Sequence, residues 1–167
     1  MHYRMAMPVN VGFSPRDWEL APQYVSPVGE RGGVVVIDFG VLAEAERKIG
    51  SFRETPDGTL AKAPLFVDDL PAAFYRINTA FPQFTPNHNT SRRETLVVMS
   101  GALKLALNDI LHDDEEAGNL ANTFYTGEVV ELEDRPVSMQ AVGLVDPASC
   151  LTLALYRDRD IQVVPVL

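Results

Sequence analysis

The side chains best suited to proton transfer in this chain lie in one polar stretch, residues 86–94. His88 is a histidine, the side chain whose ordinary pKa lets it gain and lose a proton near neutral pH. Glu94 supplies a carboxylate, and Arg93 beside it can pair with a carboxylate or hold a phosphate. These residue types predict general acid/base chemistry in which His88 or Glu94 moves the proton.

This polar stretch leads directly into segments with a strand pattern. An apolar run over residues 95–99 is followed by Ser100-Gly101, and residues 102–107 then carry a leucine at every second position. Alternation beside a two-residue turn is typical of a β-hairpin. Polar groups just ahead of such a hairpin are placed to line the mouth or interior of a β-barrel.

The same stretch resembles the first motif of the cupin superfamily, small barrels of the double-stranded β-helix type. In that motif two histidines precede a glutamate, which precedes a glycine, and His88, Glu94 and Gly101 match it. Residues 127–137 resemble the second motif, but Ser138 stands where its final histidine would be. The resemblance covers about residues 72–158. It implies an all-β fold, a single cupin or jelly-roll barrel, and a homodimer as the expected assembly.

The resemblance also bears on metal binding. A mononuclear cupin site uses three histidines and one carboxylate, a set that suits iron, manganese, zinc or nickel. Here His88 and Glu94 stand at two of these positions, whereas Thr90 and Ser138 replace the other two histidines. We therefore expect no metal ion and no other cofactor. A metallo-cupin dioxygenase with an unusual ligand set is the less favoured alternative.

A second resemblance is to the dTDP-4-keto-6-deoxyglucose 3,4-ketoisomerases, cupins that act on a sugar nucleotide. It covers about residues 34–160 and is carried by residues 50–54, Tyr75-Arg76, residues 87–89 and residues 156–158. In this alignment Asn87 and Asn89 replace two histidines, and His88 between them would face the other side of a strand. The two alignments disagree on whether His88 or the two asparagines point into the barrel.

We expect a polar small molecule to bind in the barrel and to contact side chains at inferred barrel-facing positions. Amide and hydroxyl groups suit sugar hydroxyls or a polarised carbonyl, arginines suit an anionic group, and tyrosines can stack on a ring or donate a hydroxyl. The expected contacts are Tyr75, Arg76, Asn87, Asn89, Arg93, Ser138, Gln140 and Tyr156.

Composition restricts the expected partners and location. The 167 residues suit one domain, and the formal net charge of −9 argues against a nucleic-acid-binding surface. The single cysteine, Cys150, cannot form an internal disulfide. The first residues lack the apolar core of a signal peptide, and no run approaches the length of a membrane span. We expect no nucleic-acid or membrane partner and a cytoplasmic location.

We divide the chain into an N-terminal arm, residues 1–32, and a barrel domain, residues 33–167. In the arm, Ser14 and Pro15 predict a short helix over residues 15–20. In the barrel domain, residues 41–48 have a helical pattern and residues 47–54 return to alternation. Strands are predicted over residues 34–39, 74–78, 124–132, 137–142 and 151–156, and residues 161–167 suit an edge strand or a dimer contact.

These observations lead to one preferred function and several alternatives. The preferred function is a metal-independent enzyme acting on a polar small molecule by acid/base chemistry, and the ketoisomerase resemblance implies isomerisation of a keto sugar nucleotide. A cyclisation, dehydration or lyase step in natural-product assembly would use the same groups. The replaced histidines also suit a barrel that binds a ligand without turnover.

Overall fold

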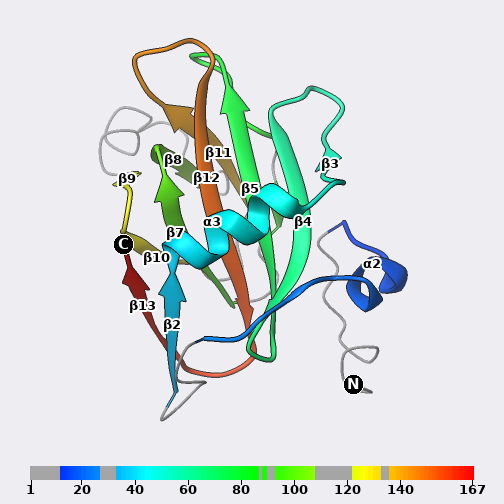
Figure 1. The fold of residues 1–167 in the computed structure, drawn as a ribbon. Coiled ribbons are helices and arrows are strands. Elements are labelled where there is room, and N and C mark those ends of the chain that lie inside the picture. Colours follow the sequence, from blue (N-terminus) through cyan, green and yellow to red (C-terminus); the bar gives the residue numbers. More distant parts are fainter. Residues whose placement is uncertain (1–11, 27–32, 87, 90–92, 108–121, 133–135) are drawn as a thin grey trace.

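The computed structural model describes residues 12–26, 33–86, 88–89, 93–107, 122–132 and 136–167. Strands make up most of this part of the chain, and the two helices of this part, α2 (Pro15–Glu19) and α3 (Phe39–Lys48), lie outside the sheets (Figure 1). The all-β fold class expected from the sequence is confirmed. No helix among the described residues is long and apolar enough to cross a membrane.

The larger sheet has the strand order β1-β4-β5-β12-β7-β10, and β3 pairs with β4 beside this path. All of its pairings are antiparallel except β1 with β4. Its strands are β1 (Gln23–Tyr24), β3 (Arg53–Glu54), β4 (Leu60–Val67), β5 (Leu70–Thr79), β7 (Arg93–Ser100), β10 (Val129–Leu132) and β12 (Ala148–Arg157).

A second sheet, with the order β6-β11-β8-β9, faces the larger one and completes the barrel. Its strands are β6 (His88–Asn89), β8 (Ala102–Leu107), β9 (Thr123–Tyr125) and β11 (Pro136–Val142). The strands β2 (Val34–Asp38) and β13 (Gln162–Val166) form a separate parallel pair. In the sequence β2 is followed directly by α3, and β13 is the last of the described strands. The tail segment predicted as an edge strand or dimer contact is thus a strand paired with β2.

Alternation along the larger sheet divides the core into two layers. On β12, Ala154 and Tyr156 belong to the barrel interior, together with apolar side chains of β8 and β11. Leu153 and Leu155 of the same strand face the other way and pack with Leu42 of α3 and with residues of β2. Figure 1 shows α3 lying across this outer face. The central strands are therefore buried on both sides.

The N-terminal segment packs onto the barrel at the edge of β4. Ser14 and Asp17 form a capping box that begins α2, so the predicted helix start is confirmed. Phe13 and Trp18 are buried, with their ring centroids 5.5 Å apart in an edge-to-face arrangement. The segment of residues 12–26 therefore contributes buried side chains to the core of the barrel.

The structure corrects three details of the predicted elements. The prediction of a β-hairpin around Ser100-Gly101 is wrong, because β7 and β8 do not pair with each other. Strand β7 pairs with β12 and β10, whereas β8 pairs with β11 and β9. The turn carries the chain from one sheet to the other. Residues 47–54 do not form a long strand, because α3 continues to Lys48 and only Arg53–Glu54 pair. The strand predicted over residues 124–132 is split between the two sheets as β9 and β10.

Gly101 is required where the chain crosses between the sheets, and we expect its replacement to be costly. Its φ is +79°, and an added Cβ would lie 2.6 Å from the backbone oxygen of Ser149. Gly58 has a similar φ of +75° with open space around it, so it isolates the cost of the backbone conformation. We predict that Gly58→Ala lowers the free energy of unfolding by about 1 kcal/mol and Gly101→Ala by roughly 3 kcal/mol. Equal losses in urea unfolding would show that the approach to Ser149 is unimportant.

Candidate functional site

Three polar side chains from three neighbouring strands meet in the barrel interior. Tyr75 lies on β5, Tyr156 on the adjacent β12, and Glu94 directly opposite Tyr156 on β7. The hydroxyl oxygens of Tyr75 and Tyr156 are 2.6 Å apart, a hydrogen bond in which either can donate. Glu94 is 2% exposed and both tyrosines are 1% exposed. The sequence predicted all three as site residues, and the structure brings them together.

The environment keeps both phenols neutral. Burial raises the pKa of Tyr75 and of Tyr156 well above 10.0, and the negative charge of Glu94 raises both further. The hydrogen bond between the two hydroxyls raises the pKa of Tyr75 and lowers that of Tyr156, as expected if Tyr75 donates to Tyr156. One hydroxyl proton is used in this bond. The other is available for a carboxylate or for a bound molecule.

Lys62 is a member of this group that the sequence analysis missed. It lies on β4 opposite Tyr75, with the same strand parity as the interior residues Leu60 and Phe66. Burial lowers the pKa of its ammonium group, and the charge of Glu94 opposes that shift. Residues 60–70 have no clear alternation in the sequence, because β4 is apolar on both faces. Only the inward parity of Leu60 and Phe66 could have identified Lys62.

The polar stretch that carries His88 forms part of the smaller sheet. His88 lies opposite Val137, and Asn89 opposite Pro136, in the pairing of β6 with β11. The side chains of His88 and Asn89, and the whole of Asn87, lie outside the described residues. The choice between His88 and the two asparagines as the inward group therefore stays a prediction, as does a catalytic role for His88.

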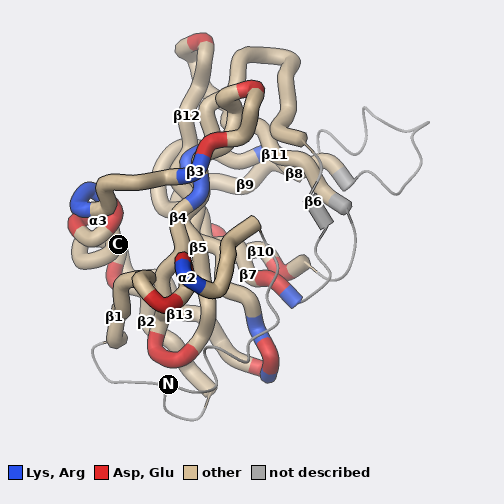
Figure 2. Tube along the Cα trace, turned by 90° about the vertical axis from the view of Figure 1, so that its right-hand side faces the viewer, with Lys and Arg blue, Asp and Glu red and all other residues tan. Residues whose placement is uncertain are grey.

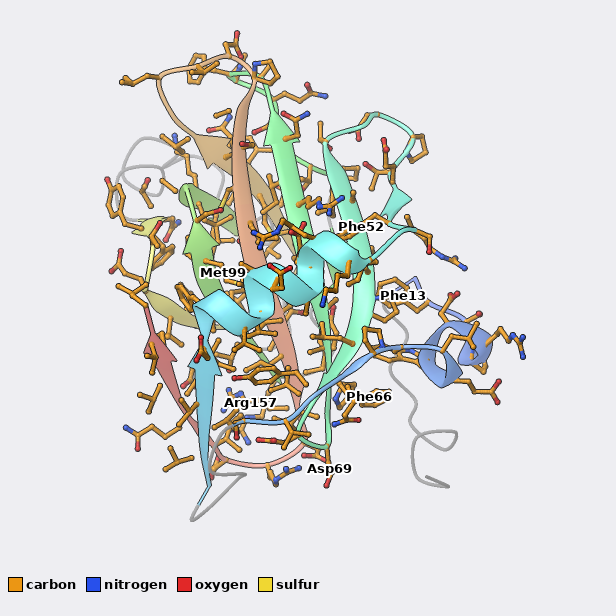
Figure 3. All side chains as sticks on the ribbon, in the orientation of Figure 1. Phe13, Phe52, Phe66, Asp69, Met99 and Arg157 are labelled. Atoms are coloured by element: carbon orange, nitrogen blue, oxygen red, sulfur yellow. The ribbon has the colours of Figure 1, made fainter. Side chains whose placement is uncertain are left out.

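Arg76 and Arg93 are not brought to the barrel interior, contrary to expectation. Arg76 follows Tyr75 on β5 and so faces outward, where its guanidinium pairs with Glu46 of α3 and stacks 3.5 Å from the ring centroid of Phe52. Figure 3 shows Phe52 at the C-terminal end of α3. Arg93 precedes Glu94 on β7 and pairs with Asp160. Strand alternation places both arginines on the face opposite the tyrosine pair.

Ser138 and Gln140 are buried, but they lie on the outer face of the smaller sheet. On β11 their neighbours Val137 and Met139 belong to the barrel interior, so the residues between and beyond them face away. The side-chain amide of Gln140 donates to the backbone oxygen of Gln83 at 3.0 Å. The position expected for the last histidine of the second motif is therefore outside the barrel, and apolar side chains occupy the inward positions of this strand.

The described residues do not fit the metal site of metal-binding cupins. No three histidine, cysteine, aspartate or glutamate side chains within the described part of the chain gather closely enough to hold a metal ion. On the two paired strands β7 and β12, the described polar side chains of the interior include the carboxylate of Glu94 and the hydroxyl of Tyr156, whereas metal-binding cupins use three histidines and a carboxylate.

Comparisons with known proteins find remote structural likenesses but identify no family. No family model matches the chain, and no curated protein matches it. A protein of unknown function from Acinetobacter sp. ADP1 is similar over 65% of this chain and 91% of its own, with 11% identity and a TM-score of 0.48. An RmlC-like cupin family protein from Methanocaldococcus jannaschii is similar over 65% of this chain and 90% of its own, with 12% identity and a TM-score of 0.38.

A third similar structure is hydroxypropylphosphonic acid epoxidase from S. wedmorenis. It is 18% identical, with a TM-score of 0.45, and the match covers 64% of this chain and 55% of the epoxidase. Likenesses of this strength do not extend to substrate or chemistry. The two facing sheets described above agree with the barrel expected from the cupin resemblance. The narrower resemblance to ketoisomerases stays a prediction.

The neutral tyrosine pair predicts a loss of stability at high pH. Because the pKa values of both hydroxyls are raised above the unfolded value of about 10, their contribution is complete below pH 10 and is lost as pH rises through the folded pKa values. Each should steepen the decline in the free energy of unfolding by about 1.4 kcal/mol per pH unit. Guanidinium unfolding between pH 8 and 11 should show a shallower decline in a Tyr75→Phe, Tyr156→Phe double variant. Tyr125→Phe, at a position that is 60% exposed, is the matched control and should follow the wild type.

Proposed function

We propose that this protein is an enzyme that transfers protons on a small carbonyl compound bound in the barrel interior, using its own side chains as acid and base. The observation that carries the proposal is the buried group of Tyr75, Tyr156 and Glu94, with the hydroxyls 2.6 Å apart and the carboxylate electrostatically coupled to both. Buried polar groups at this density are unusual in a core and are common in active sites.

The geometry supports distinct roles for the three side chains. Glu94 would accept a proton from the carbon next to the carbonyl group, and the electron pair of that C–H bond would move onto the carbonyl oxygen as an enolate forms. Tyr156, which Tyr75 holds by their mutual hydrogen bond, would donate its remaining proton in a hydrogen bond to that oxygen. For a substrate whose deprotonated carbon carries a hydroxyl group, Glu94 would return the proton to the former carbonyl carbon while the hydroxyl proton passes to the enolate oxygen, so that the carbonyl and hydroxyl groups exchange places and the isomerisation is complete.

Lys62 supports this arrangement electrostatically. Its positive charge attracts the charge of Glu94 across the interior, which offsets part of the cost of burying both. The proposal assigns the proton transfer to side chains that the structure describes in the interior, Glu94 and Tyr156. His88 remains a candidate for a second proton carrier.

The narrower proposal of a keto sugar nucleotide has less support than the broader class. Such a substrate carries a diphosphate, and the arginines expected to hold it, Arg76 and Arg93, are engaged on the outer face. A barrel that binds its ligand without turnover is the second candidate. The mutual hydrogen bond of Tyr75 and Tyr156, which the two hydroxyls form without a ligand, favours it.

Proton exchange provides a test that does not require the natural substrate. The protein would be incubated in D2O with 4-oxopentanoate, 2-oxobutanoate or dTDP-4-keto-6-deoxyglucose, and loss of the protons next to the carbonyl followed by NMR. We expect exchange with at least one compound, a loss of about 100-fold or more in Glu94→Gln, and a similar loss in Tyr156→Phe.

Glu46→Gln is the matched control, because Glu46 is also a buried glutamate but pairs with Arg76 on the outer face. Its exchange rate should stay within about twofold of the wild type. Absence of exchange with all three compounds would favour the binding protein. Undiminished exchange in Glu94→Gln would overturn the roles assigned here.

A further inference from the structure

A pocket of about 350 Å³ lies at the barrel edge, between the N-terminal segment, the chain after α3, and strands β3 and β4. The pocket does not include Tyr75, Tyr156 or Glu94. Lys62 lines the pocket and also interacts electrostatically with Glu94. The lining residues that matter here are Phe13, Asp17, Leu20, Ile49, Arg53 and Lys62.

Two cations lie side by side in the lining of this pocket. Arg53 on β3 lies directly opposite Lys62 on β4, a cross-strand pair of like charge that is unfavourable without compensation. Figure 2 shows the basic positions of β3 and β4 next to one another. The one carboxylate among the lining residues is Asp17, which is 2.7 Å from Arg53. The residues that line the pocket thus carry two positive charges and one negative charge, in a chain of net charge −9, and the charge of Lys62 also acts on Glu94 in the interior.

The environment of Lys62 strengthens its attraction for an anion. The ammonium nitrogen is 5.5 Å from the ring centroid of Phe13, and burial lowers its pKa because the charged form is partly removed from water. Figure 3 shows Phe13 at the edge of β4, beside α2. An anionic group that reached Lys62 through the pocket would be attracted to its charge, and this attraction is stronger where water is partly excluded.

The remaining wall of the pocket is apolar. Phe13 and Ile49 contribute to it, and Leu20, which is 68% exposed, lies at its rim. Small-molecule sites typically combine such a wall with a few placed polar groups, and they start at about 300 Å³. The pocket therefore suits a molecule with a short apolar body and one acidic group.

We propose that this pocket binds the acidic end of a small amphipathic organic acid, a carboxylate or a phosphate monoester, through Arg53 and Lys62. As an assignment of substrate class it rests on the proposed function, because Lys62 links the pocket to Glu94 in the barrel interior. As a binding site it stands on the charges and the apolar wall alone. The substrate class that follows is a short acid that also carries a carbonyl group.

The single tryptophan of the chain allows binding to be measured directly. Trp18 is buried against Phe13, so a ligand on the Phe13 ring should change its fluorescence. Hexanoate, hexanol and hexylamine share the same apolar body and differ in charge. We expect a saturable response to hexanoate, about tenfold weaker binding of hexanol, and none of hexylammonium. Hexyl phosphate distinguishes the two acids, and the tighter binder of the two identifies the preferred group.

Variants identify the side chains responsible. Arg53→Gln and Lys62→Gln should each weaken hexanoate binding about tenfold, and Lys62→Arg should restore most of it. Arg16→Gln, at an exposed arginine of α2 that does not line the pocket, is the matched control and should bind as the wild type does. Unchanged affinity in both Gln variants, or hexylammonium binding as tightly as hexanoate, would overturn the proposal.

Failure of this proposal can be separated from failure of the proposed function. Glu94→Gln should lose proton exchange while hexanoate binding is retained. A wild-type protein that binds hexanoate through Arg53 and Lys62 but exchanges no protons would keep the pocket and reject the enzyme. A protein that exchanges protons, but whose hexanoate affinity does not change in the Arg53 and Lys62 variants, would keep the enzyme and reject the pocket.

Discussion

The alternation of side chains along three adjacent strands, β5, β12 and β7, is the constraint on which the rest of this structure depends. Side chains of one parity meet in the barrel interior, and those of the other parity meet beneath α3. Tyr156 and Arg157 are neighbours in sequence, yet the first joins the interior group and the second pairs with Glu131 at 3.1 Å on the outer face. A shift of one residue in the pairing of β12 would exchange them and dismantle the site.

The ion pairs of the outer face help to hold that register. Arg157 is almost fully buried and ties β12 to Glu131 of β10, and Arg93 ties the start of β7 to Asp160. The strand ends fixed in this way carry Tyr156 and Glu94 on their inner side. Removing Glu131 would take the ion-pair partner from the buried Arg157, whereas the pair of Arg93 with Asp160 is exposed to water and contributes less. The same strand ends thus carry the polar group of the interior on one face and the ion pairs on the other.

The same alternation explains what the sequence could and could not predict. The helix at Ser14 and the strand type were predictable because capping residues and β-branched runs act locally. Tyr75, Tyr156 and Glu94 were found from motif resemblance. The prediction placed three residues on the wrong face, Arg76, Arg93 and Ser138. A strand that is buried on both sides has no polar face, so the sequence shows which residues share a face but not which face points into the barrel. Which strands pair across the Ser100-Gly101 turn depends on contacts far along the chain, and no local pattern encodes them.

Lys62 gives the two sites a physical means of communication under the functions proposed here. Its single charge acts on Glu94 in the interior and would also act on an acid in the pocket at the barrel edge. One ammonium group cannot fully compensate two carboxylates, so an acid bound beside Lys62 would compete with Glu94 for the same positive charge. Such coupling is reciprocal: the acid weakens the attraction between Lys62 and Glu94 by as much as Glu94 weakens the attraction between Lys62 and the acid. Binding free energy gained at the non-reacting end of the substrate would then act on the carboxylate at the reacting end.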